Sequence, residues 1–203
     1  YNAKQGIDGS DWVGLKNFDF LFKTKDAWII TRNTLGYNLL FILLNMVFGV
    51  TFAIFISDIK GKGAKRLYQS MVLLPHLMST VIISYIVYAV LSPDKGMMNN
   101  TILPLLDRTA ISWYNEPKYW PFILAIVNTW KTIGYGCLVY ISGIAAIDES
   151  YYEAAVLDGA TKWQQIRYVT LPCLKNSILT LFLLNLGRIF YSDFGLFYQV
   201  PMN

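Results

Sequence analysis

The sequence has very few of the side chains that bind metals, form disulfides or carry out hydrolysis. Its 203 residues include one histidine, His76, and two cysteines, Cys137 and Cys173, which lie far apart and form no CxxC pair. A zinc site is therefore excluded, and a structural disulfide is not expected. The chain also lacks the GxxxxGK[ST] phosphate loop, the GxSxG elbow and the HExxH helix. We therefore predict no enzymatic activity and no cofactor bound by this chain itself.

Charged residues are scarce as well. They make up 15% of the chain, whereas hydrophobic residues make up 55% and the mean hydropathy is +0.40. This balance is unusual for a soluble domain and typical of a membrane protein. The net charge is +4, but the 17 lysines and arginines are scattered and form no basic stripe with interleaved aromatics. Nucleic-acid binding is therefore not expected.

Four apolar stretches between residues 34 and 190 are candidates for membrane spans. The first has no Asp, Glu, Lys or Arg, and about 22 helical residues at ~1.5 Å each suffice for the hydrocarbon core. Pro75 lies in the second stretch and is expected to kink that helix without ending it. The sequence therefore predicts an all-α, polytopic transmembrane helical bundle with four spans. The stretches are 35–56, 67–91, 119–147 and, as the weakest of the four, 176–190.

The segments outside these stretches suggest an orientation. Residues 1–33 alternate charges with aromatics, a pattern that suits the membrane surface. The loop 58–66 carries four basic residues beside a helix end. Basic residues concentrate on the cytoplasmic side of a membrane protein, so this loop is predicted to be cytoplasmic.

The loop 148–172, between the third and fourth stretches, has the local chemistry of two short helices. Ser150 with Glu153 predicts a capping box at the start of the first helix, and Thr161 with Gln164 predicts one at the start of the second. Two short helices tethered between membrane spans are typical of a docking element.

The ends of these two helices are also marked. Gly159 is placed where a left-handed residue commonly ends a helix, and Pro172 predicts that the second helix stops at Leu171. An apolar face is expected on the second helix, formed by Trp163, Ile166 and Val169.

This loop contains a glutamate, alanines, a glycine and a terminal Leu-Pro at a particular spacing. At this spacing the loop resembles the EAA loop of binding-protein-dependent ABC importer permeases. The stretch WVGLKNFDFLF (12–22) and the ending GRIFYSDFGLFYQVP (187–201) are similar to the branch of these permeases that imports carbohydrates. The residues that carry the EAA resemblance are Glu153, Ala154, Ala155, Gly159, Ala160, Leu171 and Pro172.

The resemblance implies a type I ABC importer permease, a multi-pass protein of the bacterial cytoplasmic membrane that forms the path for a solute, here a carbohydrate. Its implied partners are an ATPase dimer that binds ATP and Mg²⁺, a homologous second permease, an extracytoplasmic solute-binding protein and the lipid bilayer. The loop 148–172 would face the cytoplasm, whereas 1–33 and 92–118 would face outward and 191–203 would begin an outer loop. Six core spans are usual in this family, so we expect the first and last to lie outside this sequence.

The resemblance also implies roles within the loop. Glu153 would pair with a basic residue of the ATPase, Ala154 and Ala155 would allow close helix approach, and Gly159 would make the bend.

Four polar residues in or near the spans are candidates for the solute path. Lys131 and Arg188 are cations in apolar surroundings, which are costly to bury and are therefore often functional. Either side chain could instead snorkel or join an ion pair. Asn128 and Asn185, like other asparagines in the spans, could contact sugar hydroxyls, but bonding across helices is the favoured interpretation.

Two other functions remain open at this point. An ion-coupled secondary transporter would need carboxylates within its spans, but the stretches 35–56, 67–91 and 119–147 contain no Asp or Glu. A membrane scaffold without a transport role is the second alternative, and binding to an ATPase would distinguish it from an importer permease.

Overall fold

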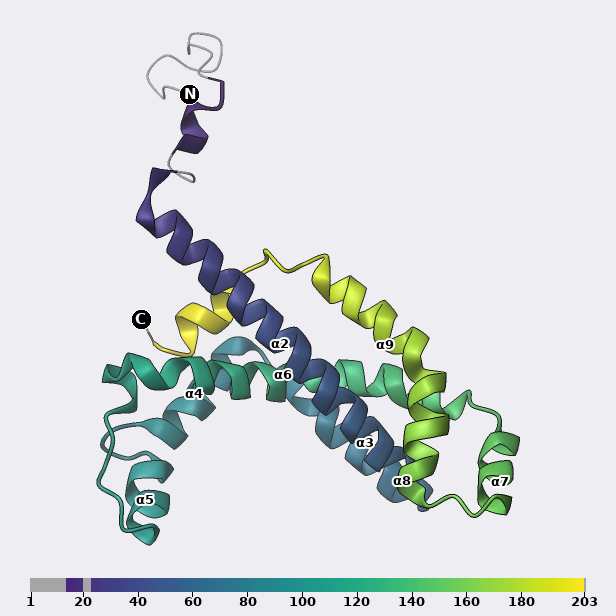
Figure 1. Ribbon diagram of the computed structural model, residues 1–203. Helices are drawn as coiled ribbons and strands as arrows, with labels where there is room; N and C mark the ends of the chain where they lie inside the picture. The colour runs from purple at the N-terminus through teal and green to yellow at the C-terminus, as the bar shows by residue number, and fades with distance from the viewer. Residues whose placement is uncertain (1–13, 20–22, 203) are drawn as a thin grey trace.

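The computed structural model describes residues 14–19 and 23–202, and its regular structure in these ranges is entirely helical (Figure 1). Trp12, Leu21 and Phe22, which support the similarity at 12–22, lie outside the described residues. The longer helices are α2 (Lys25–Ser57), α3 (Lys62–Leu77), α4 (Thr80–Leu91), α6 (Trp120–Ala145), α7 (Glu149–Leu157) and α9 (Leu171–Leu186). The shorter ones are α5 (Leu103–Leu105), α8 (Lys162–Gln165), single 3-10 turns at Lys16–Phe18, Trp113–Asn115 and Pro117–Tyr119, and π turns at Met98–Ile102, Ile166–Thr170 and Gly195–Gln199.

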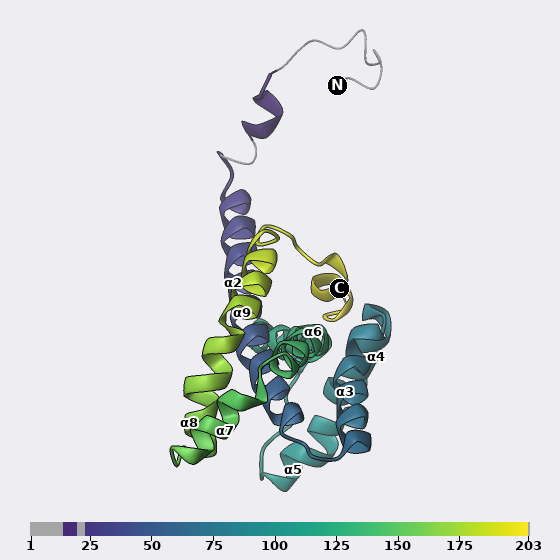
Figure 2. The ribbon, with the colours of Figure 1, turned by 90° about the vertical axis from the view of Figure 1, so that its right-hand side faces the viewer.

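The predicted membrane bundle is confirmed. Within the described residues, three helical stretches have the length and composition to cross a membrane: Lys25–Ser57, Pro117–Ala145 and Lys162–Leu186. The bent pair α3 and α4 makes a fourth span if both helices belong to one crossing. Figure 2 shows α6 nearly end-on, with α2 and α9 on one side and α3 and α4 on the other.

The first span starts earlier than its apolar stretch predicted. The Thr24 hydroxyl accepts a hydrogen bond from the Ala27 N–H at 3.3 Å and caps α2. The helix therefore begins at Lys25, ten residues before Leu35. The inner face of α2 then packs against α6 in a cluster formed by Val50, Ala53, Ile56, Cys137, Tyr140 and Ile141.

The prediction that Pro75 only kinks the second span was wrong, because the span is broken. α3 ends at Leu77, α4 begins at Thr80, and their axes differ by 100°. Proline lacks the N–H that would continue the ladder of hydrogen bonds. Ser79 then caps a new helix by accepting a hydrogen bond from the Ile82 N–H at 3.3 Å.

The prediction that Pro172 ends the second loop helix was also wrong. Residues Lys162–Leu186 form one continuous 25-residue helix that joins α8 to α9. A π turn at Ile166–Thr170 widens the helix before the proline, and the Leu171 N–H donates to the Ile166 carbonyl. Pro172 therefore falls in the first turn of α9, where its missing N–H costs little.

This helix also ends earlier than the stretch 176–190 predicted, at Leu186. Arg188 therefore lies in the turn that follows the helix. Beyond this turn, residues 195–199 form a π turn that packs against α4, with Leu196 and Val200 buried beside Ile83 and Val87. The segment 191–202, which the sequence predicts to begin an outer loop, thus contributes side chains to the core.

Close approach of α3 to α6 depends on Gly134. A Cβ at this position would lie 2.3 Å from the Val72 carbonyl oxygen and 2.8 Å from the Leu73 Cα, so the two backbones are nearly in contact. Small residues at helix crossings are a general means of close packing in membranes.

We expect Gly134→Ala to destabilise the bundle, because the added methyl group would force α3 away from α6. Overpacking of this kind costs ~1–3 kcal/mol, which corresponds to a fall in melting temperature of roughly 2–10 °C for a chain of this size. Thermal unfolding of the detergent-solubilised protein would measure this fall in melting temperature. Gly136→Ala is the matched control, since the nearest atom to its added Cβ would be 3.9 Å away. Equal melting temperatures for the two variants would contradict the described α3–α6 contact.

Candidate functional site

The loop between α6 and α9 carries α7 and α8 at one end of the molecule (Figure 1). α7 begins at Glu149 because the side chain of Asp148 accepts a hydrogen bond from the Ser150 N–H at 2.9 Å. The predicted cap at Ser150 was therefore wrong, and Asp148 has that role. Hydrogen bonding by Ser150, first through its backbone N–H and then through its side chain, lowers the pKa of the Asp148 carboxyl.

Gly159 ends α7 as predicted. Its φ is +77°, in the left-handed region that residues with a Cβ rarely adopt. The Ala160 N–H donates to the Ala155 carbonyl at 2.9 Å, and the Gly159 N–H donates to the Val156 carbonyl at 3.0 Å. These two bonds form a Schellman motif, so the direction in which the chain leaves α7 depends on this glycine.

The second predicted capping box is confirmed. The Gln164 side chain accepts from the Thr161 N–H at 2.7 Å, and the Thr161 hydroxyl accepts from the Gln164 N–H. The buried Gln165 amide donates to the Ala160 carbonyl at 3.1 Å, which ties the turn to α8. α8 is therefore held at both its start and its first turn.

Two further contacts, which the sequence patterns did not reveal, hold the loop against the rest of the chain. The Tyr152 hydroxyl lies 2.9 Å from the Thr170 hydroxyl and joins α7 to the π turn. Lys162 forms an exposed ion pair with Asp58 at 2.9 Å. This pair places the loop 58–66 at the same end of the molecule as α7 and α8.

The loop presents apolar side chains to its surroundings. Trp163 is 68% exposed and Leu157 is 88% exposed, whereas Ile166 and Val169, predicted to share a face with Trp163, are partly buried. Glu153, Ala154 and Pro172 are exposed, and Ala155, Ala160 and Leu171 are partly buried. Exposed apolar patches of this kind mark sites of interaction with another protein. The exposed large apolar residues of the loop are Tyr151, Val156, Leu157, Trp163 and Tyr168.

The candidate solute-path residues on α6 have different partners. The Asn128 side-chain oxygen accepts from the Asn45 amide at 3.3 Å, and the Thr132 hydroxyl donates to the Asn45 side-chain oxygen at 2.7 Å. Asn128 therefore bonds across helices, as the sequence favoured. The Lys131 ammonium instead donates to the Thr80 hydroxyl at the start of α4.

The other two candidates lie on or after α9, and the structure does not join them to Asn128. The exposed Asn185 amide donates to the Leu181 carbonyl at 2.7 Å within its own helix. Arg188 is exposed and stacks its guanidinium on Tyr191, 4.8 Å from the ring centroid. The turn that carries Arg188 is held on α2, because the Asn38 amide donates to the carbonyls of Ile189 and Tyr191 at 2.9 Å.

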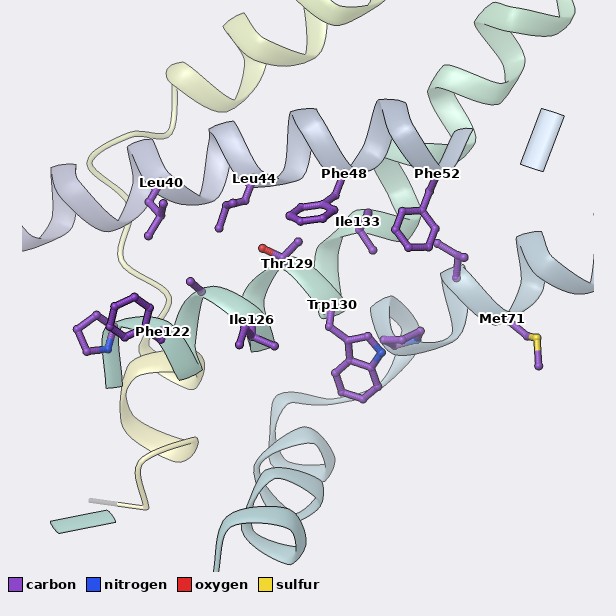
Figure 3. Close-up of a pocket in the computed structure, with 14 residues that line it drawn as sticks. Leu40, Leu44, Phe48, Phe52, Met71, Phe122, Ile126, Thr129, Trp130 and Ile133 are labelled. Atoms are coloured by element: carbon purple, nitrogen blue, oxygen red, sulfur yellow. The ribbon is translucent and has the colours of Figure 1, made fainter. Parts of the chain in front are cut away.

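A groove of about 730 Å³ lies between α2, α3 and α6. Figure 3 shows Leu44 and Phe48 of α2 pointing toward α6, with Thr129 of α6 between the two helices. The Thr129 hydroxyl and the Trp130 N–H are the polar side-chain groups among its lining residues. Because so few of its lining groups are polar, this groove suits a lipid chain or an apolar helix better than a sugar.

Fold and loop together define a multi-pass helical membrane protein with a docking element outside its spans. The family model for the binding-protein-dependent transport system inner membrane component matches residues 45–192. The chain therefore belongs to this family.

The most similar proteins include carbohydrate permeases. The polygalacturonan/rhamnogalacturonan transport system permease protein YteP of Bacillus subtilis is 31% identical over 188 residues, which cover 92% of this chain and 58% of YteP. The trehalose/maltose transport system permease protein MalF of Thermococcus litoralis is 29% identical over 83% of this chain and 56% of its own length. The chain thus spans less than two thirds of these relatives.

A solved structure shows the same fold. In the crystal structure of a bacterial ABC transporter that imports the acidic polysaccharide alginate, one chain matches with a TM-score of 0.83 and 29% identity, covering 97% of this chain and 71% of that chain. A second crystal structure, of the alginate transporter with a periplasmic protein bound to an alginate pentasaccharide, matches with a TM-score of 0.82.

We expect Asp148→Ala to loosen the first turn of α7, because the Ser150 N–H loses its acceptor. Hydrogen–deuterium exchange should become faster at the amides of residues 150–152, and Ser150→Ala should have a smaller effect. Since the cap lowers the pKa of Asp148, its contribution to stability is present above the ordinary aspartate pKa of 3.8 and is lost as the pH falls through the lowered pKa. Faster exchange in Ser150→Ala alone would contradict the Asp148 cap and support the Ser150 capping box predicted from sequence.

Proposed function

We propose that this chain is the permease subunit of an ATP-driven bacterial importer and that it forms the membrane path for an oligosaccharide. The observation that carries the proposal is the helix pair α7–α8, which is capped at both starts and presents exposed apolar side chains. Membership of the permease family and the printed functions of the similar proteins support it. Such a subunit is typically not an enzyme.

The proposed partners follow from this role. An ATPase dimer would bind ATP and Mg²⁺ and dock on the loop 148–172, with Glu153 facing one of its basic residues. A homologous second permease would complete the path, and a solute-binding protein would deliver the solute from outside. A secondary transporter is disfavoured because α2, α4 and α6 carry no Asp or Glu within their apolar stretches.

The side of the membrane that each loop faces can be tested by cysteine labelling in a Cys137→Ala, Cys173→Ala background. We expect Ala64→Cys and Lys162→Cys to react only from the cytoplasm, because the Lys162–Asp58 ion pair places both loops at one end. Lys16→Cys and Arg108→Cys should react only from outside. These four positions are exposed, so burial does not limit the reaction. Reaction of Lys162→Cys from outside would contradict the importer topology.

The coupling role is tested by Gly159→Val. A Cβ at Gly159 would meet no atom within 4 Å, so the substitution acts through the backbone alone. A β-branched residue at φ +77° is strained by roughly 1–3 kcal/mol. The direction of α8 should therefore change, so that α8 no longer fits the ATPase surface on which it docks. We expect weaker copurification of the ATPase and loss of solute-stimulated ATP hydrolysis, with the melting temperature of the spans unchanged.

Gly159→Asn is the matched control, because asparagine tolerates the left-handed region better than valine. It should retain most of the ATPase binding. Wild-type coupling in Gly159→Val would show that the bend at Gly159 is not needed, and a chain that binds no ATPase in any form would favour the scaffold alternative.

A further inference from the structure

The apolar groove between α2, α3 and α6 follows a helix that has the length and composition to cross a membrane. Its wall on α2 is a stripe of side chains spaced four residues apart, which lie along one face of the helix (Figure 3): Leu40, Leu44, Phe48 and Phe52. At ~1.5 Å per residue, this stripe is ~18 Å long. One leaflet of the hydrocarbon core is about 15 Å deep. The groove therefore has about the length of one acyl chain of a phospholipid.

This groove is open to its surroundings. Phe52 of α2, Met71 of α3 and Phe122 of α6 all line it, and all three side chains are exposed. Lipid tails are as apolar as these side chains, so a tail that enters the groove from the bilayer exchanges one apolar environment for another. The apolar walls by themselves would suit a neighbouring helix as well, and the charges at one end of the groove distinguish the two.

Four cations lie where α2 passes into α3. The one carboxylate of this segment, Asp58, is already paired with Lys162 at 2.9 Å. The other ion pairs among the described residues, Lys23–Asp19 and Lys118–Glu116, lie elsewhere in the chain. This end of the groove thus presents positive charge that no carboxylate in the described part of the chain pairs with. The four cations are Lys60 in the connection and Lys62, Lys65 and Arg66 in the first two turns of α3.

Lys65 is the cation best placed for the groove. It lies seven residues, or two helical turns, before Val72, which lines the groove, so both residues are on one face of α3. Two turns separate them by ~10 Å along the axis, and the headgroup layer begins outside the hydrocarbon core and is about 5–8 Å deep. A lysine extends its ammonium toward that polar layer. Lys65 is partly buried, whereas Arg66, one residue further round the helix, is exposed on the opposite face from Met71.

Tyr68 occupies the position between the cation and the groove. It lies three residues after Lys65 and four before Val72, on the same face of α3, and it is exposed. Tyrosine is enriched at the membrane interface, because its ring is apolar and its hydroxyl is polar. This face of α3 therefore changes from a cation to an interfacial aromatic and then to apolar side chains. A phospholipid changes in the same order, from its phosphate to its glycerol and its acyl chains.

We propose that this groove binds an anionic phospholipid, with one acyl chain along the α2 stripe and the phosphate beside Lys65. A zwitterionic phospholipid would fill the groove equally well, but it has no net charge to offset the cations. An apolar helix would fill the groove and leave the cations without a counterion. Charge complementarity therefore favours the anionic lipid over both. This site is separate from the path of the solute, and the inference does not depend on the proposed function.

The test uses the protein purified in detergent together with any subunits that copurify, so that a groove covered by a neighbouring subunit is also covered in the assay. The probes are phosphatidylglycerol and phosphatidylcholine with brominated acyl chains, since bromine quenches tryptophan fluorescence on contact. Trp130 lines the groove, and its signal is the difference between the wild type and Trp130→Phe. We expect phosphatidylglycerol to quench Trp130 at a mole fraction about 5-fold or more below that of phosphatidylcholine, the factor that one cation beside an anionic headgroup contributes.

Three variants separate the site from a general attraction of anionic lipids. Lys65→Gln should lower the preference for phosphatidylglycerol about 5-fold, and Lys65→Arg should keep it. Arg66→Gln is the matched control, because it removes the same charge from the same end of α3 but from the other face, and it should keep most of the preference. Melting temperatures report the folding of each variant. Native mass spectrometry of the wild type and Lys65→Gln counts the bound lipids directly if Trp130→Phe fails to fold.

Several results would overturn the lipid site while leaving the proposed importer in place. Equal quenching by the two lipids in the wild type would show that the cations do not select the lipid. The same preference in Lys65→Gln and Arg66→Gln would reduce the effect to general surface charge. Absence of Trp130 quenching by either lipid would show that an apolar helix covers the groove. Weaker copurification of the ATPase with Lys65→Gln, at an unchanged lipid preference, would assign this lysine to protein docking.

Discussion

In the hydrocarbon layer, backbone N–H and C=O groups have to find hydrogen-bond partners within the protein. This constraint explains why Pro75 and Pro172 have opposite effects. After Pro75 the helix stops, and Ser79 caps a new one in another direction. Before Pro172 a π turn pairs Leu171 with Ile166, so the helix continues. The first proline thus creates the break that brings Thr80 to Lys131, and the second lets the loop and the last span share one helix.

Helix packing around α6 depends on the absence of side chains at a few positions. Gly134 brings α6 against the α3 backbone, and Gly143 leaves room for Leu174 of α9, whose side chain would lie 2.8 Å from an added Cβ. On α2, Gly49 does the same for Tyr140. Because apolar side chains gain little from leaving lipid for a helix interface, such close contacts are a main source of cohesion in a membrane bundle. They also set where the polar residues of α6 meet their neighbours.

Several polar residues within the bundle hydrogen-bond to a neighbouring helix or turn. Asn45, Asn128 and Thr132 bond to one another across α2 and α6, and Asn38 holds the turn after α9 on α2. These groups stabilise the arrangement without needing a ligand. Lys131 makes a further contact between helices, because its ammonium donates to the Thr80 hydroxyl at the start of α4.

The sequence by itself determined the all-helical membrane class, the approximate spans and the helical loop 148–172, including the left-handed Gly159 and the Thr161–Gln164 capping box. These features depend on hydropathy and on hydrogen bonds between residues a few positions apart, which a local pattern records. Tertiary structure decided the break after Leu77, the continuous helix through Pro172, the cap at Asp148 and the partners of Lys131. A proline reveals that a hydrogen bond is missing but not how it is replaced. The contact between Lys131 and Thr80 joins residues 51 positions apart, so it depends on how the helices pack.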